Sequence, residues 1–506
     1  MGRATLGITR FELPKFDRGY FPNKDFEDVP DGGSSDCKHV IWNRSSLRPM
    51  YGMDRINSSA AATTRGQGVH YLNVAGVSKR TAVFGSVFYE DVAGVLTNRT
   101  GIYPITDGAS NHVQSINWQS GSNKYAIYTN GVDYPWKWTG SGNISALGGS
   151  APANFTSIAS YNRAVFGSSD EIVYFSNTDD AETWTSTRDQ LNFDKTVTCL
   201  IDNDQKLAVF MDDHVGSIQG FDYLDMTKEI SEIDKVGCVG RLAATKAFFG
   251  KGNTPVIATI SRDGIYIIDQ AFGAERLLGE NYFEEFNQTN ISKSVLAYSK
   301  RDNLLFAALP YDDATENDYL IVIDMISGAF WPCPDIHTNS IRSMASMKDD
   351  NGNEFVYFID AAGYAFKFNR TTKNYHTGTA SQGIDARFKT KRFDLKDIHQ
   401  LRSPEMLADA DGDWNVTVAI NFGIGSGDGD TGYVNLLGDG DSLDVDFILD
   451  ASALSGYLYA FQVVSGLGGF GRFVSITFSH SDVDETFNIK KMELQLKRRR
   501  MGSRDK

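Results

Sequence analysis

A short run of apolar residues returns between polar turns along this chain, and it constrains the fold more than any other feature. Its copies are AVFG at 164–167, LAVF at 207–210, LLFA at 304–307 and FVYF at 355–358. Each copy follows a polar turn, and most lead to a second run that ends in Asp, Asn or Gly. A strand-turn-strand unit that recurs every ~40–50 residues predicts a β-propeller.

The repeating units follow one another from about residue 65 to residue 372 and predict seven blades, with an error of one. An Asp-Gly turn at 263–264 and a turn at Gly363 are typical of hairpins within blades. Because blades pack face to face, both faces of a strand can be apolar. The predicted blade centres are 68–103, 113–140, 155–177, 197–220, 241–270, 294–331 and 341–369.

The length of 506 residues exceeds what one core supports and indicates two or three domains. With 48 Gly and 12% aromatic residues, the composition favours an all-β protein with many turns. We expect an extended N-terminal arm at 1–35, a β-propeller with entry strands at 36–380, and a C-terminal β domain with a short basic tail at 381–506. The C-terminal domain is expected to be sandwich-like.

Two features that are not part of the repeated unit lead to further predictions. Pro14, Pro22 and Pro30 are spaced through the polar arm, which we expect to become ordered by lying on a neighbour. The segments 225–236 and 275–286 are predicted to be short helices that decorate connections between blades.

The net charge of −15 argues against a protein that wraps nucleic acid, because phosphate contacts need clustered Lys and Arg. It suits ordinary solubility, and also a channel wall that must not hold passing DNA. The first residues contain no apolar run of signal-peptide length. The uncharged stretch 451–471 is rich in Gly, so it predicts a strand and a loop rather than a membrane anchor.

The four cysteines, Cys37, Cys199, Cys238 and Cys333, lie far apart in the sequence. No CxxC motif or Cys/His cluster is present, which argues against zinc. Free, buried thiols in a reducing compartment are the expected state.

The segment 177–184 (NTDDAETW) approximates the Asp-box of sialidase-type propellers, Ser/Thr-x-Asp-x-Gly-x-Thr-Trp. Asp179, Thr183 and Trp184 occupy its characteristic positions, whereas Asn177 and Ala181 depart from it. In such a box the Asp caps a hairpin turn and the Trp packs into the blade. The match therefore supports a propeller and says little about catalysis.

Catalytic and cofactor motifs are absent from the sequence. There is no GxxxxGK[ST], GxSxG, HExxH or Rossmann fingerprint, and the eight His are scattered. A sialidase would need an arginine triad and a tyrosine nucleophile; Arg163, Arg241 and Arg262 lie near strand starts, as any turn arginine would. We therefore expect no enzymatic activity, no cofactor and no catalytic metal.

One acidic loop has part of a calcium-binding pattern. Asp409, Asp411 and Asp413 have the one-three-five oxygen spacing of such a loop. The EF-hand pattern then needs Gly and Glu where this chain has Trp414 and Ile420, so the match fails and solvated turns are expected.

Several short sequence segments, taken together in their order along the chain, resemble those of a known protein family. They are PDGGSSDCKHV at 30–40, LRPMYG at 47–52, YTNGVDYPWKW at 128–138, FSN at 175–177 with Trp184, SRDGIY at 261–266 and GIDARFKTK at 383–391. This set resembles the tail hub or nozzle proteins of short-tailed bacteriophages, also called packaged-DNA stabilisation proteins.

The resemblance implies a virion protein, made in the host cytoplasm, that forms a homo-oligomeric ring, usually a hexamer, below the portal and adaptor proteins. Such a ring continues and can gate the DNA ejection channel, lets DNA pass without specific binding, and docks tail fibres. The family has no catalytic residues to transfer. In this context Asp428, Asp430, Asp439 and Asp441 of the Gly/Asp-rich loop 423–441 are candidate channel or tip residues, with a plain surface loop as the alternative.

Two other functions fit the same residues. The first is a glycan-binding or sialidase-like propeller. The second is a monomeric propeller that serves as an interaction scaffold.

Overall fold

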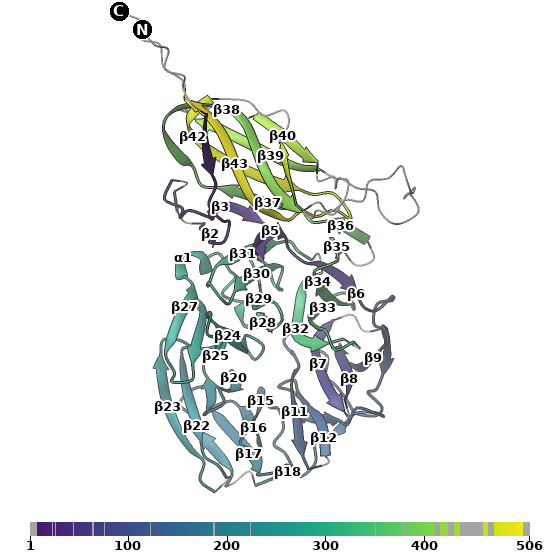
Figure 1. Cartoon of the computed structure of the whole chain (residues 1–506). Coiled ribbons are helices and arrows are strands. Elements are labelled where there is room, and N and C mark those ends of the chain that lie inside the picture. Colours follow the sequence, from purple (N-terminus) through teal and green to yellow (C-terminus); the bar gives the residue numbers. More distant parts are fainter. Residues whose placement is uncertain are drawn as a thin grey trace, which may run out of the picture.

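The computed structural model has two β-rich domains, a propeller and a smaller sheet domain, stacked end to end (Figure 1). It describes residues 8–498, apart from 410–414, 424–429, 436–458, 464–469 and the loop positions 23, 26, 44, 63–64, 75, 122, 186–187, 223, 338, 350 and 378–379. Helical structure in this part is limited to α1 (Glu280–Phe283) and a 3-10 turn at Ile291–Lys293. No helix among these residues is long and apolar enough to cross a bilayer.

Seven antiparallel sheets form the blades of a propeller, which confirms the predicted fold and blade number. Blade 1 consists of β7 (Gly66–Val74), β8 (Val77–Phe84), β9 (Val87–Val92) and β10 (Val95–Asn98). Blade 2 consists of β11 (Gln114–Ser120), β12 (Asn123–Thr129), β13 (Trp136–Trp138) and β14 (Ser145–Ala146). Blade 3 consists of β15 (Ser157–Tyr161), β16 (Ala164–Ser169), β17 (Ile172–Asn177) and β18 (Asp180–Trp184), with β19 (Gln190–Asn192) beside β17. Blade 4 consists of β20 (Cys199–Asp202), β21 (Leu207–Phe210), β22 (His214–Gln219) and β23 (Thr227–Asp234). Blade 5 consists of β24 (Ala244–Phe249), β25 (Thr254–Ser261), β26 (Gly264–Asp269) and β27 (Ala274–Leu278). Blade 6 consists of β28 (Val295–Ser299), β29 (Leu304–Leu309), β30 (Tyr319–Asp324) and β31 (Phe330–Pro334).

Blade 7 joins the two ends of the propeller sequence. It contains β32 (Ile341–Lys348), β33 (Glu354–Asp360) and β34 (Ala365–Asn369), and its fourth strand is β6 (Gly52–Arg55) from the N-terminal region. Met53 lies opposite Phe368 and is fully buried. The ring is therefore closed by backbone hydrogen bonds between segments more than 300 residues apart in sequence.

The apolar runs of the sequence are the second strands of their blades. The runs at 164–167, 207–210, 304–307 and 355–358 lie in β16, β21, β29 and β33. All residues of β21 and β29 are buried. A second strand has neighbours on both faces, because each blade packs between two others, and this explains why these runs do not alternate with polar residues.

Aspartates shape the turns that follow third strands. The carboxylates of Asp91, Asp269 and Asp324 each accept a hydrogen bond from a backbone N–H two to four residues further on. This arrangement is an Asx-turn, which replaces strand pairing where the chain reverses. It accounts for the acidic residue that ends many of the repeating units.

The described part of the sheet domain has twelve strands, five of which come from the first 50 residues. They are β1 (Ile8–Glu12), β2 (Gly19–Tyr20), β3 (Gly33–Lys38), β4 (Val40–Asn43), β5 (Ser46–Pro49), β37 (Ala386–Thr390), β38 (Phe393–Asp409), β39 (Asn415–Gly423), β40 (Asp430–Asn435), β41 (Tyr459–Val463), β42 (Phe470–His480) and β43 (Ile489–Arg498). A separate hairpin, β35 (Asn374–Thr377) and β36 (Ala380–Gly383), follows blade 7. Alternate residues of β39 are buried, which places the core on one face of that strand.

The N-terminal arm lies on its own sheet domain rather than standing free. Strand β1 pairs antiparallel with β43, and Ile8 is opposite Lys497. Phe16 is buried in edge-to-face contact with Phe388 and Phe478, with ring centroids 5.4 and 5.5 Å apart. An apolar side chain that packs into the core of the same chain fixes the arm there.

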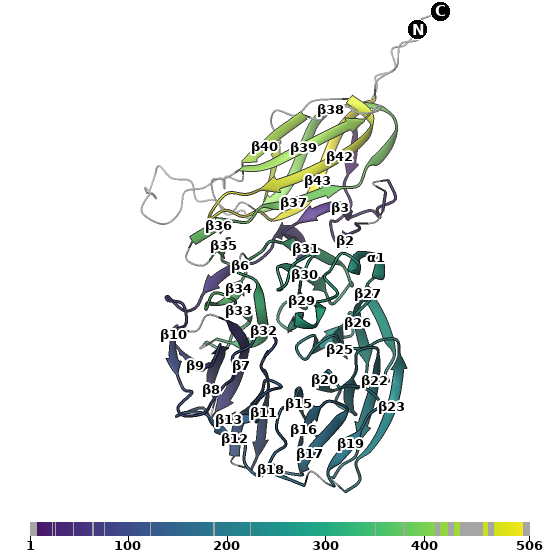
Figure 2. The ribbon, with the colours of Figure 1, turned by 180° about the vertical axis from the view of Figure 1, so that it is seen from behind.

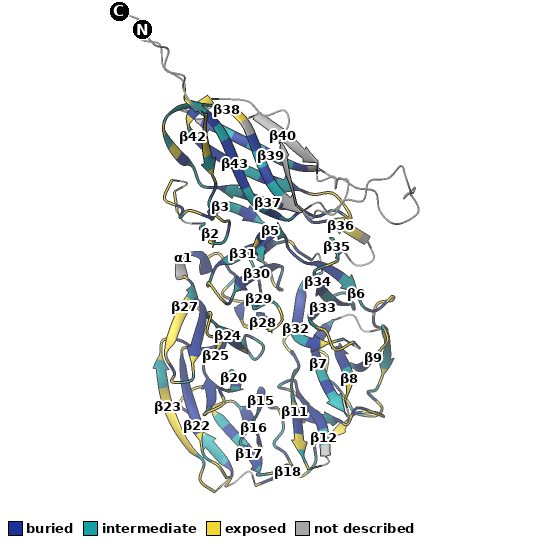
Figure 3. Cartoon of the chain, viewed as in Figure 1, coloured by how far each residue is buried: buried dark blue, intermediate teal, exposed yellow. Residues whose placement is uncertain are grey.

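The prediction of two helices was largely wrong. Residues 227–234 form β23, the outer strand of blade 4, and residues 274–278 form β27, the outer strand of blade 5; only the four residues of α1 are helical. Figure 3 shows both strands with many exposed residues on the outside of the propeller. An outer strand that pairs with a single neighbouring strand carries mostly polar residues, so its composition resembles that of a solvated helix. Only its hydrogen bonding to the neighbouring strand distinguishes the two.

Ring closure by β6 can be tested with a buried and an exposed residue in outer strands. Met53→Ala should lower the free energy of unfolding by about 2–5 kcal/mol, because it leaves a cavity beside Phe368. Val95→Ala in β10, where Val95 is 64% exposed, should change it by less than about 0.5 kcal/mol. Urea denaturation followed by tryptophan fluorescence measures both; equal effects would contradict the placement of β6.

Candidate functional site

The Asp-box-like segment forms the hairpin between β17 and β18. Asp179 has a positive φ of 62° and its carboxylate pairs with Arg163. The next residue, Asp180, caps the turn: its oxygens accept hydrogen bonds from the Glu182 N–H at 2.9 Å and the Thr183 hydroxyl at 2.6 Å. The capping that the sequence assigned to Asp179 thus belongs to Asp180.

Trp184 lies where the Asp-box pattern places its tryptophan. Its side chain is buried against Phe155, with ring centroids 5.4 Å apart, and its indole N–H donates to the Ala181 carbonyl at 2.9 Å. These contacts are all structural.

The candidate channel residues can be placed only in part. Asp428, Asp439 and Asp441 lie outside the described residues. Asp430 is the first residue of β40 and is opposite Ile420 of β39.

The four cysteines are buried, as the sequence predicts. Burial raises the pKa of the Cys37 and Cys333 thiols, so both remain protonated and unreactive at neutral pH.

Sequence reasoning missed one group of possible metal ligands. His480, at the end of β42, and Asp482 and Glu485 in the following turn each place one ligand atom within 4.8 Å of the others. The spacing His-x-Asp-x-x-Glu is the signal in the sequence, but it matches neither the Cys/His zinc motifs nor the one-three-five spacing of a calcium loop.

The arginines considered for a hydrolase separate into different surroundings. Arg163 pairs with Asp179, and Arg262 donates to Asp212 at 2.7 Å; both arginine side chains are more than half exposed. Arg241 instead lines a pocket at the centre of the propeller. An arginine triad does not form from these residues.

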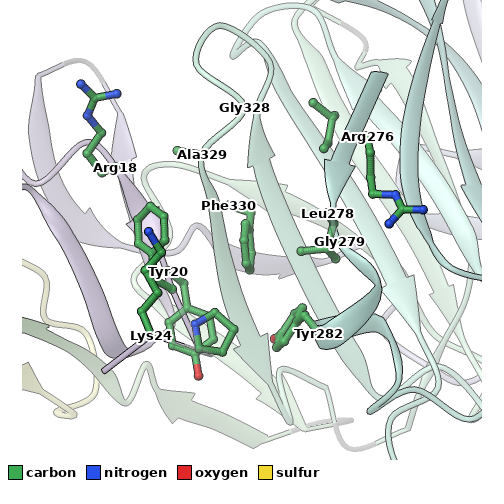
Figure 4. A pocket seen from close by; sticks show the side chains of 13 residues that line it. Arg18, Tyr20, Lys24, Arg276, Leu278, Gly279, Tyr282, Gly328, Ala329 and Phe330 are labelled. Atoms are coloured by element: carbon green, nitrogen blue, oxygen red, sulfur yellow. The ribbon is translucent and has the colours of Figure 1, made fainter. Parts of the chain in front are cut away.

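A larger cleft lies where the arm meets the propeller (Figure 4). Its volume is 510 Å³, and its lining comes from the arm, from β27 with the turn before α1, and from the start of β31. Tyr20, Tyr282 and Phe330 form aromatic walls, and Arg18 and Lys24 line the cleft on the arm side, whereas the guanidinium of Arg276 pairs with Asp263. Its described lining contains no carboxylate, His, Ser or Cys; besides the arginines, its titratable groups are the phenols of Tyr20 and Tyr282 and the amino group of Lys24.

Tyr20 is the side chain that joins the two domains at this cleft. Its ring makes edge contacts with Tyr282 and Phe330, with centroids 5.9 and 6.0 Å apart. It packs against the core of the sheet domain as well as that of blades 5 and 6. Burial, helped by the nearby Cys37 and Glu285, raises the pKa of Tyr20 to about 12, so the phenol is neutral.

Gly19 allows this close approach. Its φ is +79°, and a Cβ atom there would lie 2.7 Å from the Phe330 carbonyl oxygen. Both the backbone conformation and the space require glycine at this position.

His39 provides a second link between the domains. Its backbone N–H donates to the Pro332 carbonyl of β31 at 3.0 Å, and its Nδ1 lies 3.0 Å from the Tyr375 hydroxyl. Burial, with Lys38 nearby, lowers the pKa of His39 to about 4. The described residues around the cleft therefore form a joint between domains.

Comparison with known proteins gives no family. No protein-family model and no curated protein matches the chain. Solved structures that resemble it include virginiamycin B lyase from Staphylococcus aureus (11% identity, TM-score 0.41, covering 63% of this chain and 98% of that one) and a streptogramin B lyase (10%, 0.43, 63% and 98%). PorZ, a surface component of the type-IX secretion system of Porphyromonas gingivalis, follows at 13% identity and a TM-score of 0.38, covering 65% of this chain and 39% of that one. Likenesses this distant carry no argument about activity, and the propeller assignment rests on the chain's own strand pairing.

The fit of Gly19 can be tested with a matched glycine. Gly19→Ala should release the arm from the propeller, because the new methyl group meets the backbone of Phe330. Gly76→Ala has a similar φ of +83° but open space around it, so it isolates backbone strain. We expect trypsin to cleave after Arg18 at least tenfold faster in Gly19→Ala than in Gly76→Ala. A tenfold difference corresponds to a loss of roughly 1.4 kcal/mol in the free energy of opening the arm. Equal cleavage rates in the two variants would contradict the joint.

The buried His39 predicts a pH dependence of stability. Its pKa is about 4 in the folded chain and about 6.5 when unfolded, so between about pH 6.5 and pH 4 the unfolded state binds this proton and the folded state largely does not. Stability should fall as pH drops from 6.5 towards 4, by up to about 1.4 kcal/mol per pH unit from this group. His39→Asn, which tolerates the local φ of +53°, should reduce the slope between pH 6.5 and 5.5 in urea titrations. An unchanged slope would contradict this role.

Proposed function

We propose that this chain is a structural protein of a short-tailed bacteriophage tail, whose copies associate into a ring that extends the DNA ejection channel and docks fibres. Its propeller serves as an interaction scaffold, and the chain carries out no catalysis. Portal or adaptor proteins would bind one end of the ring.

One observation carries this proposal: a single hydrophobic core continues from the sheet domain into blades 6 and 7. Phe16, Ile41 and Phe478 of the sheet domain belong to the same buried cluster as Phe306 and Phe358 of the propeller. Two domains with a shared core move as one body, because sliding them would expose apolar surface. A rigid two-domain block suits a component that must keep its shape under pressure.

The N-terminal segment strengthens the same arrangement. Strands β2, β3 and β4 of the sheet domain contact β31, and the chain then passes directly into β6 of blade 7 (Figures 1 and 2). The phrases that resemble nozzle proteins are distributed over this junction, over blades 2, 3 and 5, and over β37. The resemblance therefore spans both domains.

Charge is compatible with a path for DNA. Six copies would carry a formal charge of about −90, which repels phosphate rather than holding it. Passing DNA would then meet little friction from ion pairing.

A row of residues across the neighbouring strands β42, β38, β43 and β1 of the sheet domain is a candidate subunit contact. Phe470 lies opposite Gln400, Gln400 opposite Lys497, and Lys497 opposite Ile8, so the four side chains share one face. Phe470 is 47% and Ile8 60% exposed. Burying this pair between subunits would stabilise association.

Ring formation can be tested on the purified full-length chain. We expect light scattering and negative-stain electron microscopy to find closed rings. Replacing both Ile8 and Phe470 with Glu should abolish them by burying charge in the contact, whereas Val95→Glu on the exposed strand β10 should not. A wild-type chain that is monomeric at every concentration, or one that hydrolyses glycosides, would contradict the proposal.

A further inference from the structure

We propose that the pocket on the propeller axis binds a phosphate group, carried by inorganic phosphate or by a small phosphomonoester. This site is separate from the subunit contact and from the cleft at the arm. Its volume is 230 Å³, enough for a small ligand.

The segments that lead into the innermost strands of five blades build this pocket. Ser110, Thr156, Thr198, Gly240 and Ser292 come from blades 2, 3, 4, 5 and 6, and each lies within four residues of the start of its strand. Five converging segments place hydroxyl groups and backbone around one point on the axis. A ligand there would contact most of the ring at once.

Arg241 crosses the axis and has no carboxylate partner among the described residues. Its Nη1 donates to the His112 carbonyl of blade 2 at 3.0 Å. Gly131 makes room for the guanidinium, since a Cβ atom there would lie 2.5 Å from Nη2. Burial lowers the pKa of Arg241 to about 10, yet it remains charged at neutral pH. A partly buried, unpaired guanidinium is unfavourable unless an anion joins it.

Two further polar groups in the pocket have no hydrogen-bond partner at normal geometry, although the Arg342 carbonyl lies close enough to His112 to affect its pKa. His112 is buried, and neither ring nitrogen has a partner at normal hydrogen-bond geometry. The hydroxyl of the fully buried Ser294 is also without a partner. Buried polar atoms are nearly always satisfied in folded proteins, so these groups point to a ligand.

The surrounding charge selects an anion. Arg241, Lys293 and Arg342 all raise the local potential at His112, and Glu316 is the acid that pairs with Lys293 and Arg342. Three cations against one carboxylate leave a net charge of +2 at the axis of a chain whose total is −15. The same cations disfavour a metal ion at His112.

A neutral His112 favours an anion that carries a proton, such as hydrogen phosphate, over one that does not. Burial and the three cations lower the pKa of His112 to about 3, which outweighs the opposite effect of the Arg342 carbonyl. A neutral imidazole offers one donor and one acceptor. Hydrogen phosphate can accept from Arg241 and Ser294 and also donate its own proton to the imidazole, whereas sulfate and the dianion of a phosphomonoester can only accept, including from the imidazole N–H.

Isothermal titration calorimetry of the full chain tests the site with inorganic phosphate, glycerol 1-phosphate and sulfate at equal ionic strength. We expect binding of at least one phosphate compound with a Kd below about 10 mM, and weaker binding of sulfate. Tighter binding of inorganic phosphate or of glycerol 1-phosphate shows whether the bound phosphate group belongs to free phosphate or to a phosphomonoester. Absence of binding by both, or equal affinity for sulfate, would overturn the assignment.

Three variants connect the binding to this pocket. Arg241→Gln should weaken phosphate binding at least about tenfold through the lost charge-assisted hydrogen bond. Arg262→Gln, which removes an exposed arginine paired with Asp212, should leave the affinity unchanged. Ser294→Ala should weaken binding about two- to tenfold without lowering the melting temperature of the free protein, because it removes a hydroxyl that has no partner. Unchanged affinity in Arg241→Gln and Ser294→Ala would contradict the site.

Discussion

The pairing of β6 with β34 is the interaction on which the rest of the structure depends. A propeller is stable only when its last blade meets its first, and here the fourth strand of that last blade comes from residues 52–55. Because β3, β4 and β5 directly precede β6 in the chain and belong to the sheet domain, ring closure also fixes the second domain. The segment that contains β6 therefore determines both the closure of the propeller and the position of the sheet domain.

The energetics of the junction follow from this connection. Tyr20, whose ring contacts Phe330, and His39, which donates to Pro332, lie within about thirty residues of β6 in sequence, and the same segment supplies Val40, Ile41 and Leu47 to the shared core. Each would be costly to separate, since separation exposes aromatic surface or leaves a buried backbone group without a partner. The proposed role in assembly draws on the cohesion of this junction, and the proposed phosphate site draws on the buried polar groups of the axial pocket.

Local patterns in the sequence predicted the local structure well. The all-apolar run at 207–210 identifies a strand buried on both faces, and the Asp that ends β26 or β30 identifies a turn, because both signals depend on neighbours close in sequence. Residues 227–234 were misassigned because an outer strand has the polar composition of a solvated helix. The role of β6 and the approach of Arg241 to His112 depend on contacts between distant segments, which no local pattern reveals.

Native-state hydrogen exchange of the β6 amides tests the central claim most directly. If β6 closes the ring, its hydrogen-bonded amides should exchange with the same free energy of opening as those of β34, as members of one cooperative unit. Exchange of β6 at the rate of a free loop, while β34 remains protected, would contradict the account.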